Sequence, residues 1–279
     1  MPSPALHRPP RRPHAWAMVF ALSQLVLVAL WWRHGWQLGL PALLLTHGAL
    51  VWGTLRPGSR LFSPVLSRLP TTRRAVWLTI DDGPSDDTRE VLDLLRRYGA
   101  QATFFLVGDR AALRPDLVQA IQASGHTIGN HSASHPQAWF WALPPSRMRR
   151  QVDQAQQVLT AITGTPPRWF RAVVGMANPF VAPALRRHGL ARVAWSARGY
   201  DAVAADPAAV VARIERALRP GAIVLMHEGA RHGRNVDTLA LLLQRLQTLE
   251  YATVLPEELE AEPRTAPHPV AAARARDTA

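Results

Sequence analysis

The sequence contains no cysteine and no lysine. The absence of cysteine excludes disulfide bonds, thiolate metal ligands and a cysteine nucleophile, but it does not decide the compartment. All 32 basic residues are arginines, and the formal net charge is +12. Such a charge can indicate a nucleic acid or an anionic membrane as partner. Because no arginine run is interleaved with aromatic residues, we expect no nucleic-acid partner, and RNA binding remains a minor alternative.

Two long apolar stretches occupy the N-terminal part of the chain. The first, residues 15–32, carries no charge and is long enough to cross a bilayer core of about 30 Å. The second, residues 36–55, contains Pro41 and His47. Tryptophans lie near the ends of both stretches, as interfacial belts favour. A cleaved signal peptide, a single membrane anchor and a two-helix hairpin are the competing interpretations.

The surrounding sequence favours the hairpin. A signal peptide would end in a small-residue cleavage site, whereas a second apolar stretch follows here. Three arginines precede the stretches, Arg33 alone lies between them, and Arg56 and Arg60 follow. Under the positive-inside rule, both ends of the hairpin lie in the cytoplasm. We therefore predict an inner-membrane protein with two transmembrane helices and a cytoplasmic C-terminal domain. A single anchor would place that domain outside the cytoplasm.

The rest of the chain shows an α/β pattern between two less regular segments. Short apolar strands alternate with amphipathic helices at 86–98 and 145–163, which predicts βαβ units and a parallel sheet in a closed or nearly closed barrel. The predicted strands are 76–81, 102–107, 126–130, 168–171, 191–196, 222–226 and 252–255. The predicted organisation is a basic tail at 1–14, transmembrane helices at 15–55, a proline-containing linker at 56–74, a domain at 75–257 and a disordered tail at 258–279.

Titratable residues gather where the predicted strands end. Asp81 and Asp82 end the first strand, Arg171 the fourth and His227 the sixth. Because chemistry in parallel α/β folds lies at the carboxyl ends of strands, we expect these side chains on one rim. Adjacent strand residues point to opposite sides, so Asp81 and Asp82 should have different roles. Taken alone, the sequence Asp-Asp-Gly-Pro is equally typical of a helix-capping turn.

His131 and His135 follow the third predicted strand. Their spacing of four directs both imidazoles to the same side of a helical turn. Neutral imidazoles suit zinc and similar divalent ions, and one carboxylate would complete a three-ligand site with open positions. An isolated pair with this spacing is more often structural, but the strand-end aspartates favour a metal site. His227, on the same rim, is expected to transfer a proton.

Five segments resemble the five ordered motifs of the polysaccharide deacetylases, the NodB-homology carbohydrate esterases. The resemblance covers residues 75–257 and implies a distorted (β/α)7 barrel, here preceded by the transmembrane hairpin. Residues 79–84, TIDDGP, are similar to the family's TFDDGP, and 131–135, HSASH, match H-S/T-x-x-H. Residues 170–175, FRAVVG, resemble R-x-P-Y-G, residues 195–201, WSARGYD, lie where an aspartate-bearing motif is expected, and 225–227, LMH, match L-x-H.

The resemblance also implies a ligand set and a general base. Asp82, His131 and His135 would bind one divalent metal, usually zinc. Asp81 would be the general base that activates the metal-bound water. Arg171 would hold Asp81 ionised and oriented.

Two further roles follow from the resemblance, each beside a departure from the family pattern. The backbone N–H of Val174 would form part of an oxyanion hole, but Val173 and Val174 replace Pro-Tyr, which removes a sugar-facing aromatic ring and indicates a changed substrate. His227 would be the general acid that protonates the departing amine. Arg198 occupies the usual position of the aspartate in the fourth motif, so Asp201, three residues later, is expected to orient His227 instead.

These features together predict a hydrolase acting on carbon–nitrogen bonds other than peptide bonds. We expect it to hydrolyse the N-acetyl or N-formyl amide of an amino sugar in a polysaccharide or lipid-linked glycan, with one Zn²⁺ ion as cofactor. Its expected partners are the N-acylated substrate and the membrane. Two alternatives remain open: a catalytically degenerate sugar- or metal-binding scaffold, and a deacylase of a non-sugar amide.

Overall fold

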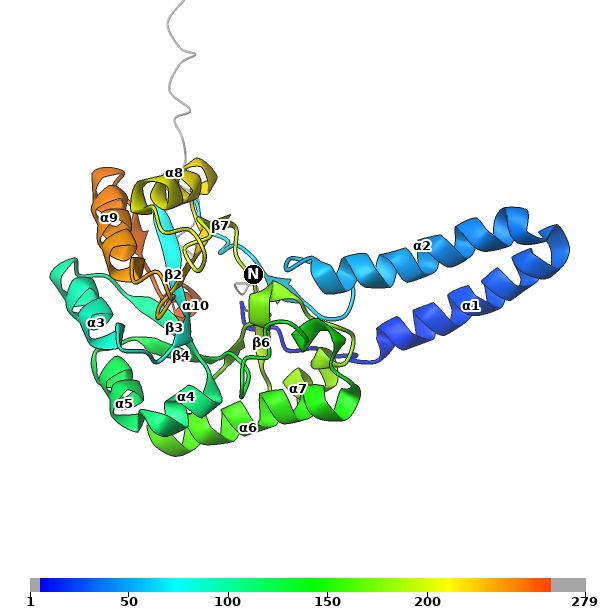
Figure 1. Ribbon diagram of the computed structural model, residues 1–279, viewed down its shortest axis with the longest axis horizontal. Helices are drawn as coiled ribbons and strands as arrows, with labels where there is room; N and C mark the ends of the chain where they lie inside the picture. Colours follow the sequence, from blue (N-terminus) through cyan, green and yellow to red (C-terminus); the bar gives the residue numbers. More distant parts are fainter. Residues whose placement is uncertain (1–5, 262–279) are drawn as a thin grey trace, which may run out of the picture.

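The computed structural model of the chain describes residues 6–261 (Figure 1). It contains all seven predicted strands and two more, β1 and β7. The strands are β1 (Val65–Leu66), β2 (Ala75–Gly83), β3 (Ala102–Leu106), β4 (Thr127–Asn130), β5 (Trp169–Phe170), β6 (Ala191–Val193), β7 (Ala197–Arg198), β8 (Ile223–His227) and β9 (Ala252–Thr253).

The strands form one curled sheet in the order β1-β6-β5-β4-β3-β2-β8-β7, with β9 paired to β2. Every ladder between these strands is parallel. The order ends at β1 and β7, so within residues 6–261 the sheet is a distorted barrel that stays open between these two strands. The predicted α/β barrel is therefore confirmed in its incompletely closed form.

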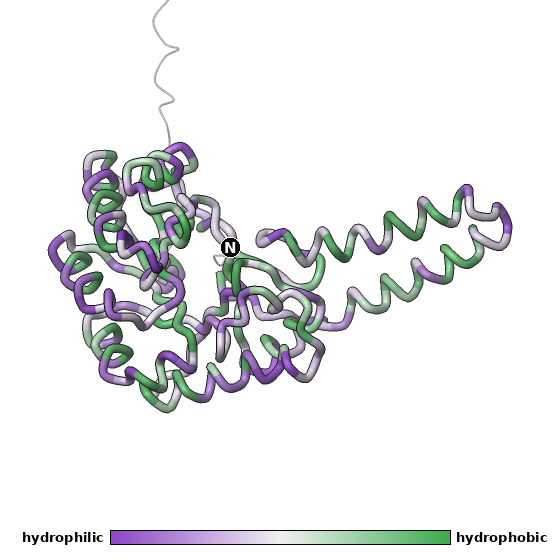
Figure 2. The backbone as a smooth tube through the Cα atoms, in the orientation of Figure 1, coloured by the Kyte–Doolittle hydropathy of each residue, from purple (hydrophilic) through white to green (hydrophobic). Residues whose placement is uncertain are grey.

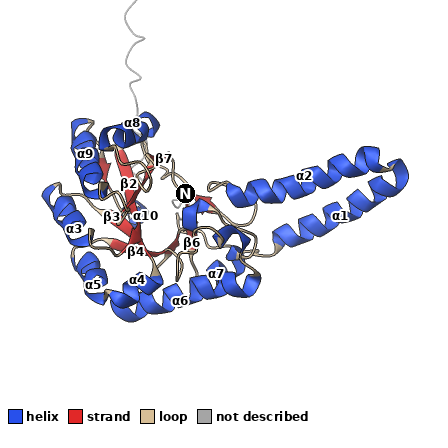
Figure 3. Cartoon of the chain, in the orientation of Figure 1, coloured by secondary structure: helices blue, strands red, loops and turns tan. Residues whose placement is uncertain are grey.

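Helices cover the outside of this sheet (Figure 3). In the C-terminal part of the chain these are α3 (Thr88–Arg97), α4 (Gly108–Leu113), α5 (Pro115–Ala123), α6 (Pro145–Thr163), α7 (Val181–Arg187), α8 (Pro207–Ala217), α9 (Asn235–Thr248) and α10 (Pro256–Ala261). Helix α6 has the predicted bounds. Helix α3 begins two residues after its predicted start, because Ser85 N–H donates to the Thr88 hydroxyl at 2.9 Å in a separate turn.

Side chains of β2 alternate between two buried clusters. Val76, Leu78 and Ile80 pack between the sheet and the helices, whereas Trp77 packs inside the barrel. Asp81 has the same parity as Trp77 and therefore continues the inner series. The neighbouring strand β8 follows the same pattern, and its last residue, His227, is the register partner of Asp81. Strand alternation thus brings polar residues into the barrel at its carboxyl rim.

The two apolar stretches form the helices α1 (Ala15–His34) and α2 (Trp36–Leu55). They pack against each other as a hairpin that projects away from the α/β body (Figure 1), and most of its length is apolar (Figure 2). Both helices are long and apolar enough to cross a membrane by length and composition, and few of their residues are buried. They are candidate transmembrane helices.

The segments on either side of the predicted domain also have structure. Strand β1 lies within the predicted linker and pairs with β6. Helix α10 includes the first residues of the predicted disordered tail, while residues 262–279 of that tail and residues 1–5 of the predicted basic tail lie outside the described residues. At the other end, the backbone N–H groups of Leu6 and His7 donate to Glu260 Oε1 at 3.0 and 3.1 Å.

Candidate active site

The two adjacent aspartates at the end of β2 approach the same imidazole. Asp81 Oδ2 lies 3.7 Å and Asp82 Oδ1 lies 3.4 Å from His131 Nε2. The pairing of β2 with β3 shifts register between Asp81 and Gly83, and Asp82 has a left-handed φ of 72°. The prediction that the two carboxylates point to opposite sides is wrong, because this bulge interrupts the strand alternation and redirects Asp82.

Asp82, His131 and His135 form the one group in residues 6–261 whose histidine and carboxylate atoms are placed to hold a metal ion. Their ligand atoms lie within 4.8 Å of one another. Asp82 Oδ1 lies 3.0 Å from His135 Nε2, and it is buried without a hydrogen-bond partner. An orphaned carboxylate oxygen that faces two imidazole nitrogens fits a divalent cation well.

The hydrogen bonding of His131 supports the same conclusion. Its Nδ1 lies 2.9 Å from the carbonyl oxygen of Arg171, which can only accept, so Nδ1 carries a proton. When the ring is neutral, Nε2 then keeps a lone pair free for a metal ion. Burial alone would raise the pKa of the Asp82 carboxyl, but the facing imidazoles of His131 and His135 hold it well below its usual range. The Asp82 carboxylate is therefore ionised at neutral pH, as a metal ligand must be.

His131 and His135 converge through a loop and not through the predicted helical turn. Residues 131–135 follow β4 without forming a helix, and Ser132 and His135 have φ of 72° and 51°. Ser132 N–H donates to Asn130 Oδ1 at 3.0 Å, and His135 N–H donates to Ser132 Oγ at 3.2 Å. These bonds fold the loop so that the two ring centroids lie 5.0 Å apart. The predicted convergence is present, but left-handed residues produce it.

Arg171 lies fully buried inside the barrel beside Asp81. Its Nη1 donates to Asp81 Oδ1 and to Thr79 Oγ1, both at 2.7 Å. Its guanidinium carbon lies 4.2 Å from the ring centroid of Phe105. Burial lowers the pKa of Arg171 and the Asp81 charge opposes this, but an arginine guanidinium stays protonated in proteins. The ion pair therefore fixes the Asp81 carboxylate at the rim.

His227 ends β8 and is held by Asp201. Its Nδ1 lies 2.9 Å from Asp201 Oδ1, and its backbone N–H donates to Asp201 Oδ2 at 2.6 Å. Burial alone would lower the pKa of His227, but the Asp201 charge and hydrogen bond, with weaker contributions from Asp81 and Asp82, raise it to about 9. The imidazole is thus protonated at neutral pH and able to act as an acid.

The remaining predicted residues are placed differently. Arg198 contacts Tyr200 rather than His227: its Nη2 donates to the Tyr200 hydroxyl at 2.9 Å, and its guanidinium lies 4.0 Å from that ring centroid. Val174 makes no hydrogen bond or ion pair with the other site residues within the described chain. It is 37% exposed and has a φ of 47°, which is strained for a β-branched residue and typical of functional sites.

Glu228, next to His227, is a buried carboxyl that sequence reasoning missed. Its Oε2 accepts hydrogen bonds from the hydroxyls of Ser85 at 2.9 Å and Thr88 at 2.5 Å. Burial raises the pKa of Glu228 to about 7, and the hydrogen bonds from those hydroxyls lower it only in part. A Cβ on Gly83 would lie 1.8 Å from Glu228 Oε1, so a larger residue there would have to displace the Glu228 carboxylate. The position of Glu228 directly after a strand-end histidine was the signal available in the sequence. The contacts of its carboxylate indicate that it stabilises the turn between β2 and α3.

Comparison with known proteins agrees with this geometry. The sequence profile of the polysaccharide deacetylase family matches residues 68–193. A chitooligosaccharide deacetylase of Bradyrhizobium sp. (strain ANU 289) is 35% identical over 158 residues, which cover 56% of this chain and 71% of the relative. The chain belongs to the polysaccharide deacetylase family. It is thus a hydrolase of carbon–nitrogen bonds other than peptide bonds, as predicted.

Solved structures of other polysaccharide deacetylases share the fold. A family 4 carbohydrate esterase from Streptomyces lividans, in complex with acetate, has a TM-score of 0.60 and 30% sequence identity, and the match covers 67% of this chain and 96% of that chain. A mutant of a family pseudoenzyme with restored enzymatic activity has a TM-score of 0.64 and 26% identity, covering 71% of each chain. The fold of polysaccharide deacetylases can therefore also carry an inactive site, which makes the metal cluster the feature to test.

We expect the purified full-length chain to hold about one divalent ion and the His135→Ala variant to lose it, because that substitution removes one of three ligands. The measurement is metal content by mass spectrometry after zinc is offered and excess is removed. His188→Ala is the matched control, since His188 pairs with Asp153 away from the cluster. A folded wild-type chain without bound metal would contradict the assignment.

Proposed function

We propose that the chain is a metal-dependent deacetylase that hydrolyses the N-acyl amide of an amino sugar in a glycan held at the membrane. The observation that carries this proposal is the meeting, at one rim, of the Asp82, His131 and His135 cluster with two separate ion pairs. Related proteins are named for chitooligosaccharides and for peptidoglycan N-acetylglucosamine, so an N-acetylglucosamine unit is the first substrate to test.

The residues would divide the reaction between them. A divalent cation in the cluster, Zn²⁺ by our assignment, would act as a Lewis acid and supply an activated water. Asp81, fixed by Arg171, would accept the proton of the attacking water. His227, held by Asp201, would donate a proton to the departing amine, because an amide nitrogen leaves poorly without one. The N–H of Val174 would donate to the developing oxyanion, independently of the valine side chain.

The alternatives find less support in this arrangement. A degenerate scaffold would not need to keep the Asp81–Arg171 and His227–Asp201 pairs beside a complete ligand set. A non-sugar amide as substrate remains compatible with the loss of the aromatic ring at Val174.

Helices α1 and α2 are proposed to insert as a transmembrane hairpin with the catalytic domain, residues 75–257, on the cytoplasmic side of the inner membrane. A lipid-linked glycan would then meet the site at the membrane.

Asp81→Asn should abolish the release of acetate from an N-acetylated chitooligosaccharide while metal content is retained. An amide cannot take the proton, and loss of a general base typically costs about 10²–10⁴ in rate. Acetate release and metal content are measured on the same full-length preparation. Asp86→Asn is the control, because the Asp86 side chain is 95% exposed. Wild-type turnover by Asp81→Asn would refute the assignment of the base.

Asp201→Asn should move the alkaline loss of activity to lower pH by about 1–3 units, the usual effect of removing an adjacent opposite charge. His227 must be protonated to act as acid, and with its pKa raised to about 9, activity falls as the pH rises through that value. Removing the Asp201 charge lowers the pKa of His227, so the fall comes earlier. The measurement is kcat/KM against pH. Asp153→Asn, at the separate His188 pair, should leave the profile unchanged; an unshifted profile for Asp201→Asn would argue against His227 as the acid.

A fluorescent protein fused after Ala279 should fluoresce, and alkaline phosphatase at the same point should stay inactive, because two membrane crossings return the domain to the cytoplasm. Phosphatase fused after Gly35, between the two helices, should be active and serves as the control. Strong phosphatase activity of the fusion after Ala279 would overturn the cytoplasmic placement.

A further inference from the structure

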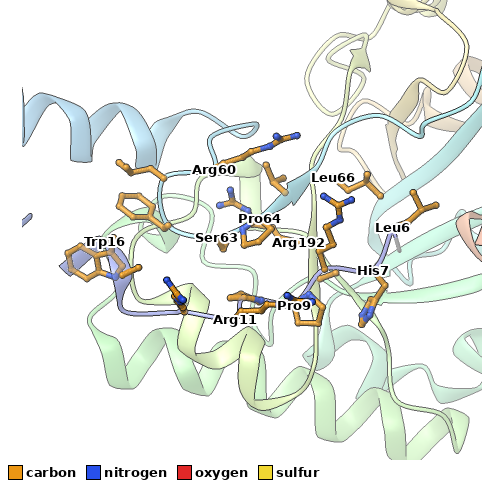
Figure 4. Close-up of a pocket in the computed structure, with 18 of the residues that line it drawn as sticks. Leu6, His7, Pro9, Arg11, Trp16, Arg60, Ser63, Pro64, Leu66 and Arg192 are labelled. Atoms are coloured by element: carbon orange, nitrogen blue, oxygen red, sulfur yellow. The ribbon is translucent and has the colours of Figure 1, made fainter. Parts of the chain in front are cut away.

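The structure contains a large cavity that shares no lining residue with the candidate active site. Its volume is about 1130 Å³. It is bounded by the segment before α1, the segment after α2 and the start of β6 (Figure 4). Figure 4 shows Arg11 from the first segment, Trp16 from the first turn of α1, Arg60 and Ser63 from the segment after α2, and Arg192 from β6 around one hollow. We call this hollow the basic cavity.

The basic cavity is strongly positive. None of the described residues that line it is an aspartate or a glutamate. The nearby Glu260 carboxylate instead bonds the backbone of Leu6 and His7 and the side chain of Arg168. Six arginines from three parts of the chain contribute to the lining: Arg8, Arg11, Arg12, Arg60, Arg68 and Arg192. Such a concentration of one charge attracts a ligand of the opposite charge.

Arg192 is the most informative of these arginines. Its side chain is only 3% exposed, and no carboxylate pairs with it among residues 6–261. One guanidinium nitrogen donates to the carbonyl oxygen of Ser59, while Nε is buried without a hydrogen-bond partner. Burial lowers its pKa to about 10, so it remains charged at neutral pH. A buried charge without a counter-ion is expensive unless a ligand supplies one.

Two more groups in the lining lack partners. Trp16 Nε1 and Ser63 Oγ are both buried without a hydrogen bond. Arg192 Nε is a third, so three lining residues from three segments each carry a buried polar atom without a hydrogen-bond partner. Buried polar groups in folded proteins nearly always find partners, so three orphaned donors in one place indicate a missing acceptor. A ligand with several anionic oxygens offers acceptors to donors of this kind.

The position of the basic cavity indicates where such a ligand comes from. Trp16 is in the first turn of α1, and Arg60 lies five residues beyond the end of α2. The cavity is therefore at the base of the hairpin, at the height where lipid headgroups would meet an inserted protein. Phe62 and Leu66 add apolar lining beside the charges, as a lipid with a charged head and an apolar body requires.

We infer that the basic cavity binds the phosphate group of an anionic lipid. Arginine guanidinium groups match the paired oxygens of a phosphate and bind them in a bidentate manner. The lipid source rests on the proposed membrane insertion of α1 and α2, whereas recognition of phosphate does not. The basic cavity is separate from the candidate active site. Acetate release from a soluble chitooligosaccharide therefore tests the proposed function independently of lipid binding.

The experiment uses the full-length chain purified in a non-ionic detergent. Short-chain phosphatidic acid, short-chain phosphatidylcholine and inorganic phosphate are each titrated in by calorimetry. We expect phosphatidic acid to bind at one site, at least about tenfold more tightly than either other probe. Electrostatic attraction and the apolar lining act together only on the anionic lipid.

The test variant is Arg11→Gln with Arg60→Gln, since both side chains are exposed and tolerate replacement. It should weaken phosphatidic acid binding at least about tenfold, and Ser63→Ala should weaken it less. The matched control is Arg149→Gln with Arg150→Gln on the exposed face of α6, which changes the net charge equally and should leave binding unchanged. Acetate release should be unaffected in all three variants.

The other outcomes are equally decisive. Inorganic phosphate binding as tightly as phosphatidic acid, with the same loss in the Arg11 and Arg60 variant, would keep the phosphate site and overturn its lipid source. Equal binding of phosphatidylcholine and phosphatidic acid would overturn the proposal, as would equal binding by the test and control variants.

Discussion

The active site depends on one buried residue, Arg171, which acts through both its side chain and its backbone. Its guanidinium fixes Asp81, and its carbonyl oxygen accepts from Nδ1 of His131 and thereby sets the tautomer that the proposed metal site needs. Breaking a buried ion pair by removing one partner typically costs about 3–5 kcal/mol, because the other charge stays buried. The position of the proposed base, Asp81, and the orientation of the proposed metal ligand, His131, are therefore coupled through a single arginine, and the Phe105 ring packs against its guanidinium.

The sequence predicted the strands well because their signal is local. Alternation of buried residues along β2 follows directly from a period of two, and extending it from Trp77 places Asp81 inside the barrel. The direction of Asp82 was not predictable in this way, since it depends on a bulge that forms only when β2 pairs with β3. The left-handed residues of the loop at His131 were not predicted either: Ser132 N–H bonds the Asn130 side chain and His135 N–H bonds Ser132 Oγ, and the spacing of the histidines does not reveal these bonds.

Where the sequence departs from the family motifs, side-chain contacts show what each residue does better than alignment does. Arg198 stands at the usual position of an aspartate, yet it turns to Tyr200, and Asp201 reaches His227 with both carboxylate oxygens. The main-chain carbonyl of Asp201 also accepts from His232 Nε2 at 2.7 Å. Asp201, which lies in the loop between β7 and α8 three residues after the end of β7, therefore supplies the carboxylate that pairs with the His227 imidazole.

The hairpin and the catalytic rim are mechanically linked at the loop that carries Val174. Ala177 N–H donates to the carbonyl oxygen of Thr54 at 3.1 Å, and a Cβ on Gly175 would lie 2.6 Å from Pro57. The end of α2 therefore rests directly on the loop in which valines replace the family's Pro-Tyr. Once α1 and α2 are inserted as proposed, this contact fixes the height of the rim above the bilayer. An active site held at a constant height would select its substrate partly by the substrate's distance from the bilayer. A sugar-facing aromatic ring at Val174 would then be less necessary for selectivity. The hairpin and the valines at positions 173 and 174 would then both suit the proposed substrate, a glycan presented at the membrane.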